Sequence, residues 1–291
     1  MKNNPYSKVC KICKNTKLNI YAHTAKCKNC GVLLCYPYPN EIRELNPAEH
    51  DRTVNQDQDF WLQWTINSGE RNHTNFTNMI KFALKKDDRQ KHLKVLDYGG
   101  GAGQFSLVLR SLYPKTEVFI VDLLETTLLD CYRPLNNQIK YSDFGLNKEK
   151  FDVIFLNDVY EHLTWPVEVL ADLSKRLKSN GRIFIDTPCT FWLYSFTKIL
   201  SKKIYRKLLK GTVDEDHQQI WTNNSFEISV KKANLNIIKY EKVSEFTQPA
   251  EYYLDNMNIK NPLIRFFGKV FYLFAPFLAR NKIQALLIKK D

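Results

Sequence analysis

Short apolar runs alternate with segments of helical periodicity through the middle and the end of this chain. The runs have the length of strands and lie at 94–97, 117–122, 139–141, 151–156, 182–186, 235–243 and 282–290. The helical segments that alternate with them lie at 105–112, 123–132, 166–177 and 224–232, and the Lys-Ser-Asn-Gly segment at 178–181 is typical of a helix end. Residues 151–156 are apolar except for Asp152, as in a strand that is buried on both faces of a parallel sheet. The pattern predicts an α/β fold, with the last run returning antiparallel.

Three segments lie outside this alternation. In 41–92, apolar residues recur at helical intervals, and we expect two helices that connect the N-terminus to the sheet and partly cover the ligand site. At about 190–212, an apolar face opposite a basic face predicts an amphipathic helix, which is typical of a membrane contact, of a pocket lid or of a solvated surface helix. At about 247–281, a broad apolar stripe predicts a lid or a shallow membrane contact.

A glycine-rich turn joins the first predicted strand to its helix. Glycines at 99, 101 and 103 allow the backbone to approach a ligand closely, and the helix that follows directs unpaired N–H groups towards it. Asp97 precedes the turn, and Asp122 ends the next strand, where an acid can bind ribose hydroxyls. The spacing G-x-G-x-G departs from the G-x-G-x-x-G of dinucleotide sites, which disfavours NAD and FAD.

Four cysteines in the first thirty residues have the spacing of a metal site. Cys10 and Cys13 form one C-x-x-C pair, and Cys27 and Cys30 form another. Four thiolates suit a tetrahedral zinc ion with no open coordination position, so we expect a structural zinc ribbon. The alternative is four free thiols in a basic loop.

The composition limits the class of protein. The chain has 291 residues, enough for one α/β domain and a small appendage, and a net charge of +12 that favours anionic partners. No uncharged apolar run approaches the roughly 20 residues that span a bilayer, and the first residues lack the apolar core of a secretory signal. We therefore expect a cytoplasmic protein that is soluble or peripherally attached to the inner face of the membrane.

The central motifs resemble those of class I S-adenosylmethionine-dependent methyltransferases in order and spacing. They are 96–103 (Leu-Asp-Tyr-Gly-Gly-Gly-Ala-Gly), Asp122, 142–144 (Ser-Asp-Phe) and 151–158 with Glu161-His162. The resemblance implies a Rossmann-like, mostly parallel sheet of seven strands with helices on both faces. It also implies that the glycines bracket the methionine part of the cofactor, that Asp122 binds the ribose, and that Asp143 and Phe144 hold the adenine. The implied cofactor-binding residues are Asp97, Gly99, Gly101, Gly103, Asp122, Asp143, Phe144 and Asn157.

A narrower resemblance concerns the first forty residues, which are similar to the zinc ribbon that precedes many bacterial methyltransferases of sugars and cell-surface glycans. It implies a zinc ribbon at 1–40, a helical linker or cap at 41–92 and a methyltransferase domain at 93–291. The expected reaction is methyl transfer, preferably to oxygen, on a sugar or glycan precursor. Such an acceptor can be anionic, for example a nucleotide-linked or lipid-linked sugar.

His217 is our first candidate for the general base, because imidazole titrates near neutral pH, and His162 and Glu161 are further catalytic candidates. Each of these side chains has a structural alternative, a hydrogen bond that holds its loop. On one helical turn Asp158, Glu161 and His162 would share a face. In the similar ubiquinone-pathway O-methyltransferases an acid-x-x-Glu-His run is associated with a divalent cation. The sequence leaves open whether a divalent cation binds at this segment of the present chain.

Two other functions stay possible on the sequence. The basic excess and the zinc ribbon favour a nucleic-acid methyltransferase, although Asn157-Asp158-Val159-Tyr160 replaces the Asn/Asp-Pro-Pro-Tyr/Phe segment expected for methylation of a base amine. A non-catalytic scaffold that binds zinc and the cofactor is disfavoured by the intact Asp97, Asp122 and glycines.

Overall fold

The structure of the chain is a computed structural model. It describes residues 9–36, 38, 58–122, 139–141, 149–190, 201–209, 213, 217–245 and 249–290. The predicted helix at 123–132 lies outside the described residues, and so do Asp143, Phe144 and the first part of the insertion at about 190–212. Within the described ranges, no helix combines the length and the apolar character that a membrane span requires.

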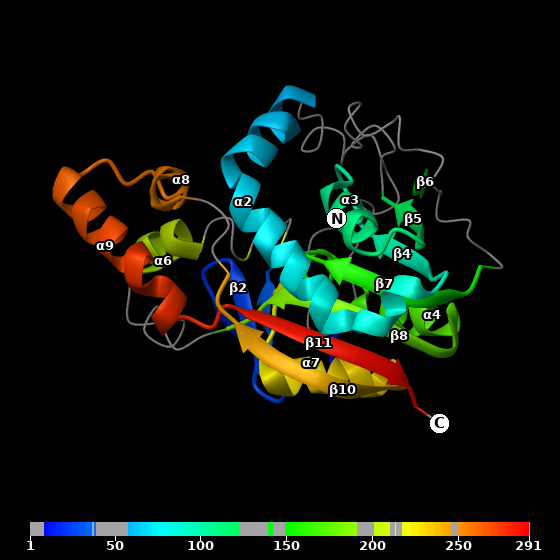
Figure 1. The fold of residues 1–291 in the computed structure, drawn as a ribbon. Coiled ribbons are helices and arrows are strands. Elements are labelled where there is room, and N and C mark those ends of the chain that lie inside the picture. Colours follow the sequence, from blue (N-terminus) through cyan, green and yellow to red (C-terminus); the bar gives the residue numbers. More distant parts are fainter. Residues whose placement is uncertain are drawn as a thin grey trace.

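The larger of two sheets has seven strands in the order β10-β11-β8-β7-β4-β5-β6 (Figure 1). They are β4 (Lys94–Tyr98), β5 (Glu117–Val121), β6 (Ile139–Tyr141), β7 (Phe151–Asn157), β8 (Leu177–Pro188), β10 (Leu235–Val243) and β11 (Lys282–Lys289). The strands from β8 to β6 run parallel, and β11 is antiparallel to both of its neighbours. The predicted Rossmann-like sheet is confirmed, including its antiparallel last strand.

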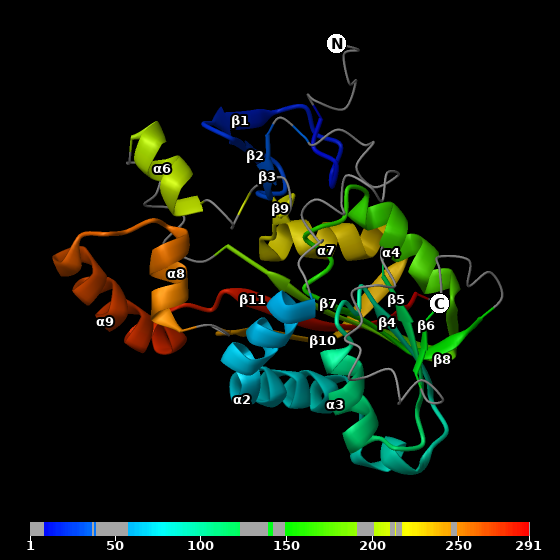
Figure 2. The same cartoon turned by 90° about the horizontal axis from the view of Figure 1, so that it is seen from above.

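Helices cover both faces of this sheet, as Figure 2 shows. One face carries α4 (Pro166–Lys175) and α7 (Asn223–Lys232), and the other carries α2 (Gln58–Ala83) and α3 (Gln104–Leu112). Neighbouring strand positions point to opposite faces. Accordingly Leu96 packs into the core on the side of α4 and α7, whereas Val95 packs into the core on the side of α2 and α3. The strands are therefore apolar on both faces, which explains the apolar runs.

β8 begins earlier than its sequence predicts. We expected 178–181 to end the helix at 166–177, but α4 ends at Lys175 and these residues open β8. They form a bulge, because the pairing with β7 passes from Leu177 directly to Arg182. A Cβ on Gly181 would lie 2.8 Å from the carbonyl oxygen of Phe151. The glycine permits this close approach, and the pattern of a helix stop was the wrong interpretation.

The segment before β4 is helical, as predicted, over the part that is described. α2 is kinked at Gly69, whose backbone (φ 7°, ψ −100°) is not helical. A short 3-10 helix, η3 (Lys86–Gln90), leads from α2 to β4.

The smaller sheet combines the N-terminal segment with a distant part of the chain. Its antiparallel order is β1-β2-β3-β9, with β1 (Leu18–Tyr21), β2 (Thr24–Cys27), β3 (Leu33–Cys35) and β9 (Gln219–Ile220). The first three strands belong to the predicted zinc ribbon, and β9 precedes α7. The ribbon is thus tied to the main domain through backbone pairing.

Three further helices form a separate group, which we call the helical lobe. It consists of α6 (Lys202–Leu209), α8 (Ala250–Asn256) and α9 (Pro262–Leu278). α8 and α9 lie between β10 and β11 in the chain and extend away from the sheet (Figures 1 and 2).

Candidate active site

The glycine turn between β4 and α3 has the backbone conformation that its sequence predicts. Gly99, Gly101 and Gly103 have φ angles of 76°, 49° and 85°, a region that residues with a side chain rarely adopt. A Cβ on Gly101 would meet no described residue within 4 Å, so among these residues the turn is bordered by space that a ligand could fill. The Gly101 N–H donates to an Asp122 carboxylate oxygen at 2.7 Å. The turn and the end of β5 therefore form one unit.

Asp97, in β4, is buried behind this turn. Its carboxylate accepts a hydrogen bond from the Ser106 hydroxyl at 2.6 Å. Burial raises the pKa of Asp97 to about 7; the Ser106 bond opposes the rise, and the charge of Asp122 adds to it. A positively charged ligand would stabilise the ionised form of both acids. These two acids therefore suit a positively charged nucleoside better than the negatively charged pyrophosphate of a dinucleotide.

Asn157 ends β7 at the same edge of the sheet. Its side-chain oxygen is buried and has no hydrogen-bond partner among the described residues. Such an orphaned acceptor is available to a donor group of a ligand. Two residues further on, Val159 packs on the glycine turn, because a Cβ on Gly99 would come within 2.4 Å of a Val159 methyl group. The loop after β7 therefore contacts the turn directly.

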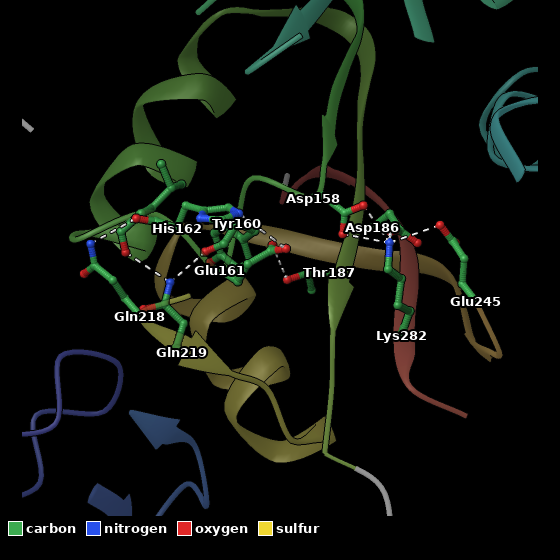
Figure 3. A network of polar contacts seen from close by, with 11 residues as sticks. Asp158, Tyr160, Glu161, His162, Asp186, Thr187, Gln218, Gln219, Glu245 and Lys282 are labelled. Atoms are coloured by element: carbon green, nitrogen blue, oxygen red, sulfur yellow. Dashed lines mark hydrogen bonds and ion pairs between the residues drawn. The ribbon is translucent and has the colours of Figure 1, made fainter. Parts of the chain in front are cut away.

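The segment 158–164, which follows β7, is held by two glutamines (Figure 3). The buried side chain of Gln219 donates to the carbonyls of Tyr160 and Leu163 at 2.7 and 3.0 Å. The backbone N–H of Gln218 donates to a third carbonyl of the segment at 2.9 Å. These bonds fix the segment that carries the predicted catalytic residues.

The structure brings together the three predicted catalytic side chains. The rings of His162 and His217 lie 4.6 Å apart between centroids, and Glu161 is 4.0 Å from His162. Glu161 is buried and accepts a hydrogen bond from the Thr187 hydroxyl at 2.9 Å. Burial, followed by the charge of Asp158, raises the pKa of Glu161 well above its usual range. Glu161 therefore holds a proton more readily than an ordinary carboxyl group does, and it lies beside two imidazoles.

This cluster permits two kinds of chemistry. An imidazole at the edge of a cleft is suited to accept a proton from a bound hydroxyl. The ligand atoms of Glu161, His162 and His217 also lie within 4.8 Å of one another, a spacing that suits a divalent cation.

Asp158 belongs to a different cluster from Glu161 and His162, although the sequence favoured a shared face. Its carboxylate lies 2.7 Å from the Lys282 ammonium, which also contacts Asp186 at 2.7 Å and Glu245 at 3.1 Å (Figure 3). Burial raises the pKa of Asp186 to about 6 and that of Glu245 to about 8, and Lys282 opposes both rises. Lys282 thus supplies the positive charge that these three acids require.

The four predicted metal-binding cysteines converge. The sulfur atoms of Cys10 and Cys30 are 3.7 Å apart, those of Cys13 and Cys27 are 3.5 Å apart, and all four lie within 4.8 Å of one another. In a tetrahedral site with metal–sulfur bonds of about 2.3 Å, the sulfurs are about 3.8 Å apart. The spacing therefore fits a structural ion.

The ribbon also holds the segment that contains His217. The Lys11 ammonium donates to the Gln218 side chain at 2.9 Å, and the Cys35 N–H donates to the Gln218 carbonyl at 3.0 Å. The Thr222 hydroxyl donates to the carbonyl of Cys30, one of the four metal-binding cysteines, at 2.8 Å. The ribbon therefore contributes to the position of His217, which adjoins these bonds.

Sequence reasoning missed the two glutamines and the cluster around Lys282. Gln218 and Gln219 follow His217 without any motif, so their role is visible only in three dimensions. The cluster around Lys282 could have been predicted from the strand positions. Asp186 lies near the carboxyl end of β8, Glu245 follows β10, and Lys282 begins the antiparallel β11. All three positions meet at one edge of such a sheet.

Comparison with known proteins gives the family context. The profile of the family described as "Methyltransferase domain" matches residues 69–240, more than half of the chain. Curated relatives include the ubiquinone biosynthesis O-methyltransferase of Histophilus somni, 27% identical over 143 residues (42% of this chain, 57% of the relative). The mitochondrial enzyme of the same name from Candida albicans is 28% identical over 142 residues (44% and 43%). The chain spans about half the length of these relatives.

Solved structures share the fold. The plantazolicin methyltransferase BpumL, in complex with a triazolic desmethylPZN analog and SAH, superposes with a TM-score of 0.53 at 17% identity, covering 85% of this chain and 97% of BpumL. The [4+2]-cyclase SpnF superposes with a TM-score of 0.51 at 14% identity, covering 74% and 81%. At such identities the likeness shows the architecture alone, and the two names show that one architecture serves different reactions.

Replacing Lys282 by methionine should destabilise the protein by about 3 kcal/mol near pH 8, because the buried Asp186 and Glu245 and the exposed Asp158 lose their shared cation. The loss should shrink near pH 5, where Asp186 and Glu245, with pKa values already raised to about 6 and about 8, take up protons. Urea unfolding at both pH values measures this difference.

The matched control is Lys289→Met on the same strand, where the ammonium donates to the carbonyl of Leu177. Its cost should stay near 1 kcal/mol at both pH values. Equal losses for the two variants, without pH dependence, would show that the acids around Lys282 do not need it.

Proposed function

Because this chain belongs to the methyltransferase-domain family, we propose that it transfers the methyl group of S-adenosylmethionine to an oxygen of a small molecule, namely a sugar or glycan precursor. The observation that carries the proposal is the glycine turn with Asp97 and Asp122 beside it, at the same sheet edge as Glu161, His162 and His217. The turn with its two acids suits a cationic nucleoside, and the histidines suit removal of a proton from the acceptor.

The residues of the turn fit the cofactor by their chemistry. When bound, S-adenosylmethionine supplies a methyl group on a positively charged sulfur, which is a good leaving group. Gly99, Gly101 and Gly103 leave room for its methionine part, and Asp122 is placed for ribose hydroxyls. Asp97 adds a buried negative charge, and the orphaned oxygen of Asn157 adds an acceptor.

The remaining task of the protein is to align the acceptor hydroxyl and to remove its proton. His217 would take the proton, with His162 as its neighbour and alternative. Glu161 accepts a hydrogen bond from Thr187, and this bond holds the loop that carries His162. In this scheme Gln218 and Gln219 are positioning residues, because they fix the loop without facing the acceptor.

The class of acceptor rests on three observations. The curated relatives are named as O-methyltransferases, which supports transfer to oxygen. The ribbon in front of the domain resembles that of sugar and glycan methyltransferases, and the net charge of +12 favours an anionic acceptor such as a nucleotide-linked or lipid-linked sugar. We place the reaction in the cytoplasm, where an inner membrane face can present the lipid-linked form.

We also propose that the four cysteines bind a structural zinc ion. Cys10, Cys13, Cys27 and Cys30 provide soft ligands at tetrahedral spacing, and they form a group separate from that of Glu161, His162 and His217. The ion would hold β3 in place, and β3 pairs with β9. Zinc would therefore act through the position of the 217–222 segment.

Cofactor affinity should increase about tenfold between roughly pH 6 and pH 8. In the free protein the pKa of Asp97 is raised to about 7, so at low pH a cationic ligand must first displace the proton of Asp97. Calorimetric titration with S-adenosylmethionine measures the affinity at both pH values. Asp97→Asn should remove the dependence, whereas Asp172→Asn on the exposed side of α4 should keep it. Affinity of the wild type that does not change with pH would contradict this role of Asp97.

Purified protein should contain about one zinc ion per chain, and Cys30→Ser should remove it. Hydrogen exchange of the 217–222 amides should then become at least about tenfold faster, because β9 loses its partner, while exchange at 183–186 in β8 stays slow. Cys35→Ser, which changes a buried ribbon cysteine outside the cluster, should retain zinc and protection. Unchanged hydrogen exchange of the 217–222 amides after loss of zinc would show that the ribbon does not hold this segment in place.

The acceptor can be found with labelled S-adenosylmethionine and cell extract divided into nucleotide-sugar, lipid and nucleic-acid fractions. Label should enter a sugar in one of the first two fractions. His217→Ala should lower turnover at least about a hundredfold while leaving cofactor affinity unchanged. The control His73→Ala, at an exposed position of α2, should behave as wild type.

Label in the nucleic-acid fraction alone would overturn the proposed acceptor. Tight cofactor binding without any methylated product would favour a scaffold. Full turnover by His217→Ala would move the proton transfer to His162.

A further inference from the structure

The helical lobe carries an unusual apolar surface. Eight large apolar side chains of α9 are more than a third exposed: Leu263, Ile264, Phe266, Phe267, Val270, Leu273, Phe274 and Phe277. They extend from the first turn of the helix to its last, where Phe277 is 83% exposed. A helix of a soluble domain usually turns such residues to the core, and a continuous exposed patch of this kind marks an interaction surface.

The lobe is well packed on its inner side, so the exposed face is not a sign of a loose helix. Leu254 of α8 fits against Gly268, where a Cβ would approach it within 2.6 Å. The rings of Tyr253 and Tyr272 stack with centroids 4.9 Å apart and planes at 11°. α8 therefore covers one face of α9 and leaves the opposite face, with its phenylalanines, to an external partner.

The charge of the lobe indicates the chemistry of that partner. α9 contains no acidic residue, and its two basic residues are paired with α8: Arg265 with Asp255 at 2.6 Å and Lys269 with Glu251 at 2.8 Å. α6 contains four basic residues and no acid. Its Lys202 and Arg206 are exposed and form no ion pair with any residue that the structure describes. The surface therefore offers apolar rings beside unneutralised positive charge.

α6 and α9 belong to one surface. Ile204 of α6 and Ile264 of α9 line the same groove, which has a volume of about 510 Å³ and whose other walls come from the loop between α8 and α9. Ile204 is itself 49% exposed. Figures 1 and 2 show α6, α8 and α9 at the same end of the molecule, away from α4 and β6.

We propose that the helical lobe docks on an anionic lipid bilayer. α9 would lie along the surface with its phenylalanines in the interfacial region, and α6 would contact the acidic headgroups. Aromatic residues beside basic ones on a helix are the combination that favours this location. A second copy of the chain is a poorer occupant, because it would bring another set of unneutralised lysines and arginines to the same contact.

The position of the helical lobe relative to the sheet bears on which class of methyl acceptor the protein uses. β10 leads into the lobe and β11 leads out of it, and Lys282, which begins β11, contacts both Glu245, which follows β10, and Asp158 at the carboxyl edge of the sheet. A bound bilayer would therefore lie on the side of the chain that carries this edge. This consequence rests on the proposed methyl transfer and favours a lipid-linked acceptor, whereas the docking itself does not depend on it.

The test is sedimentation of the full chain with vesicles of phosphatidylcholine, alone or with about one-third phosphatidylglycerol. Wild type should bind the anionic vesicles at least about tenfold more tightly than the neutral ones. The triple variant Phe266→Ser, Phe267→Ser, Phe277→Ser should lose at least about tenfold in binding to the anionic vesicles. Lys202→Glu with Arg206→Glu should abolish the preference for the anionic lipid.

The matched controls change equally exposed positions outside the lobe. Ile20→Ser with Ile238→Ser replaces apolar residues that are 50% and 53% exposed, and Lys81→Glu with Lys231→Glu reverses two exposed charges. Both should bind vesicles as wild type. Light scattering records the oligomeric state, and thermal unfolding followed by circular dichroism shows that each variant is folded as the wild type is.

Three outcomes would overturn the proposal. Wild type that stays in the supernatant with both vesicle types excludes a lipid partner. Lobe variants that bind as the controls do place the contact elsewhere on the chain. A dimer that the phenylalanine variant converts to a monomer, without vesicle binding by either, assigns the surface to a second copy. None of these readouts requires methyl transfer, so each is independent of the proposed function.

Discussion

The parallel pairing of the strands from β8 to β6 is the constraint on which the rest of this molecule depends. Parallel strands end at a common edge, so residues that are far apart in sequence become neighbours there. Asp97 pairs with Ile120 of β5, two residues before Asp122, and Asn157 pairs with Asp186. Four polar groups from four strands thus meet at one edge, and apolar layers on both faces hold the strands in place. The polar side chains of the candidate site lie at this edge because the backbone pairing brings the ends of their strands together there.

Two additions complete this edge, and each brings a distant segment to it by a different interaction. The ribbon uses backbone pairing, with β3 against β9, and so fixes the segment that carries His217. The antiparallel β11 uses charge, because Lys282 pairs with Asp158 after β7, with Asp186 near the end of β8 and with Glu245 after β10. Breaking a buried charge cluster of this kind is costly, so the cluster anchors both ends of the helical lobe to the sheet. The lobe can therefore expose an apolar face without loosening the site.

Much of the fold followed from the sequence, because local patterns encode it. The strands at 139–141 and 235–243 have the bounds that the apolar runs predicted, and the cysteine spacing predicted a cluster that the sulfur positions confirm. The interpretation of 178–181 was wrong, because a glycine after a helix resembles a helix stop even where it forms a bulge in a strand. Of the candidate site, the glycine turn and its acids carry a motif, whereas Gln218, Gln219 and Lys282 act through partners that are distant in sequence. No local sequence pattern distinguishes Gln219, whose side chain holds the 158–164 segment by hydrogen bonds, from an ordinary surface glutamine.

The central claim is that the glycine turn, flanked by Asp97 and Asp122, is a site for a sulfonium nucleoside and not for a dinucleotide. Calorimetric titration with S-adenosylmethionine and with a nicotinamide dinucleotide tests this claim most directly. We expect one molecule of S-adenosylmethionine to bind per chain, no heat from the nicotinamide compound, and loss of binding in Gly101→Val, which fills the space beside the turn. Tight binding of the nicotinamide compound, with none of S-adenosylmethionine, would contradict the account.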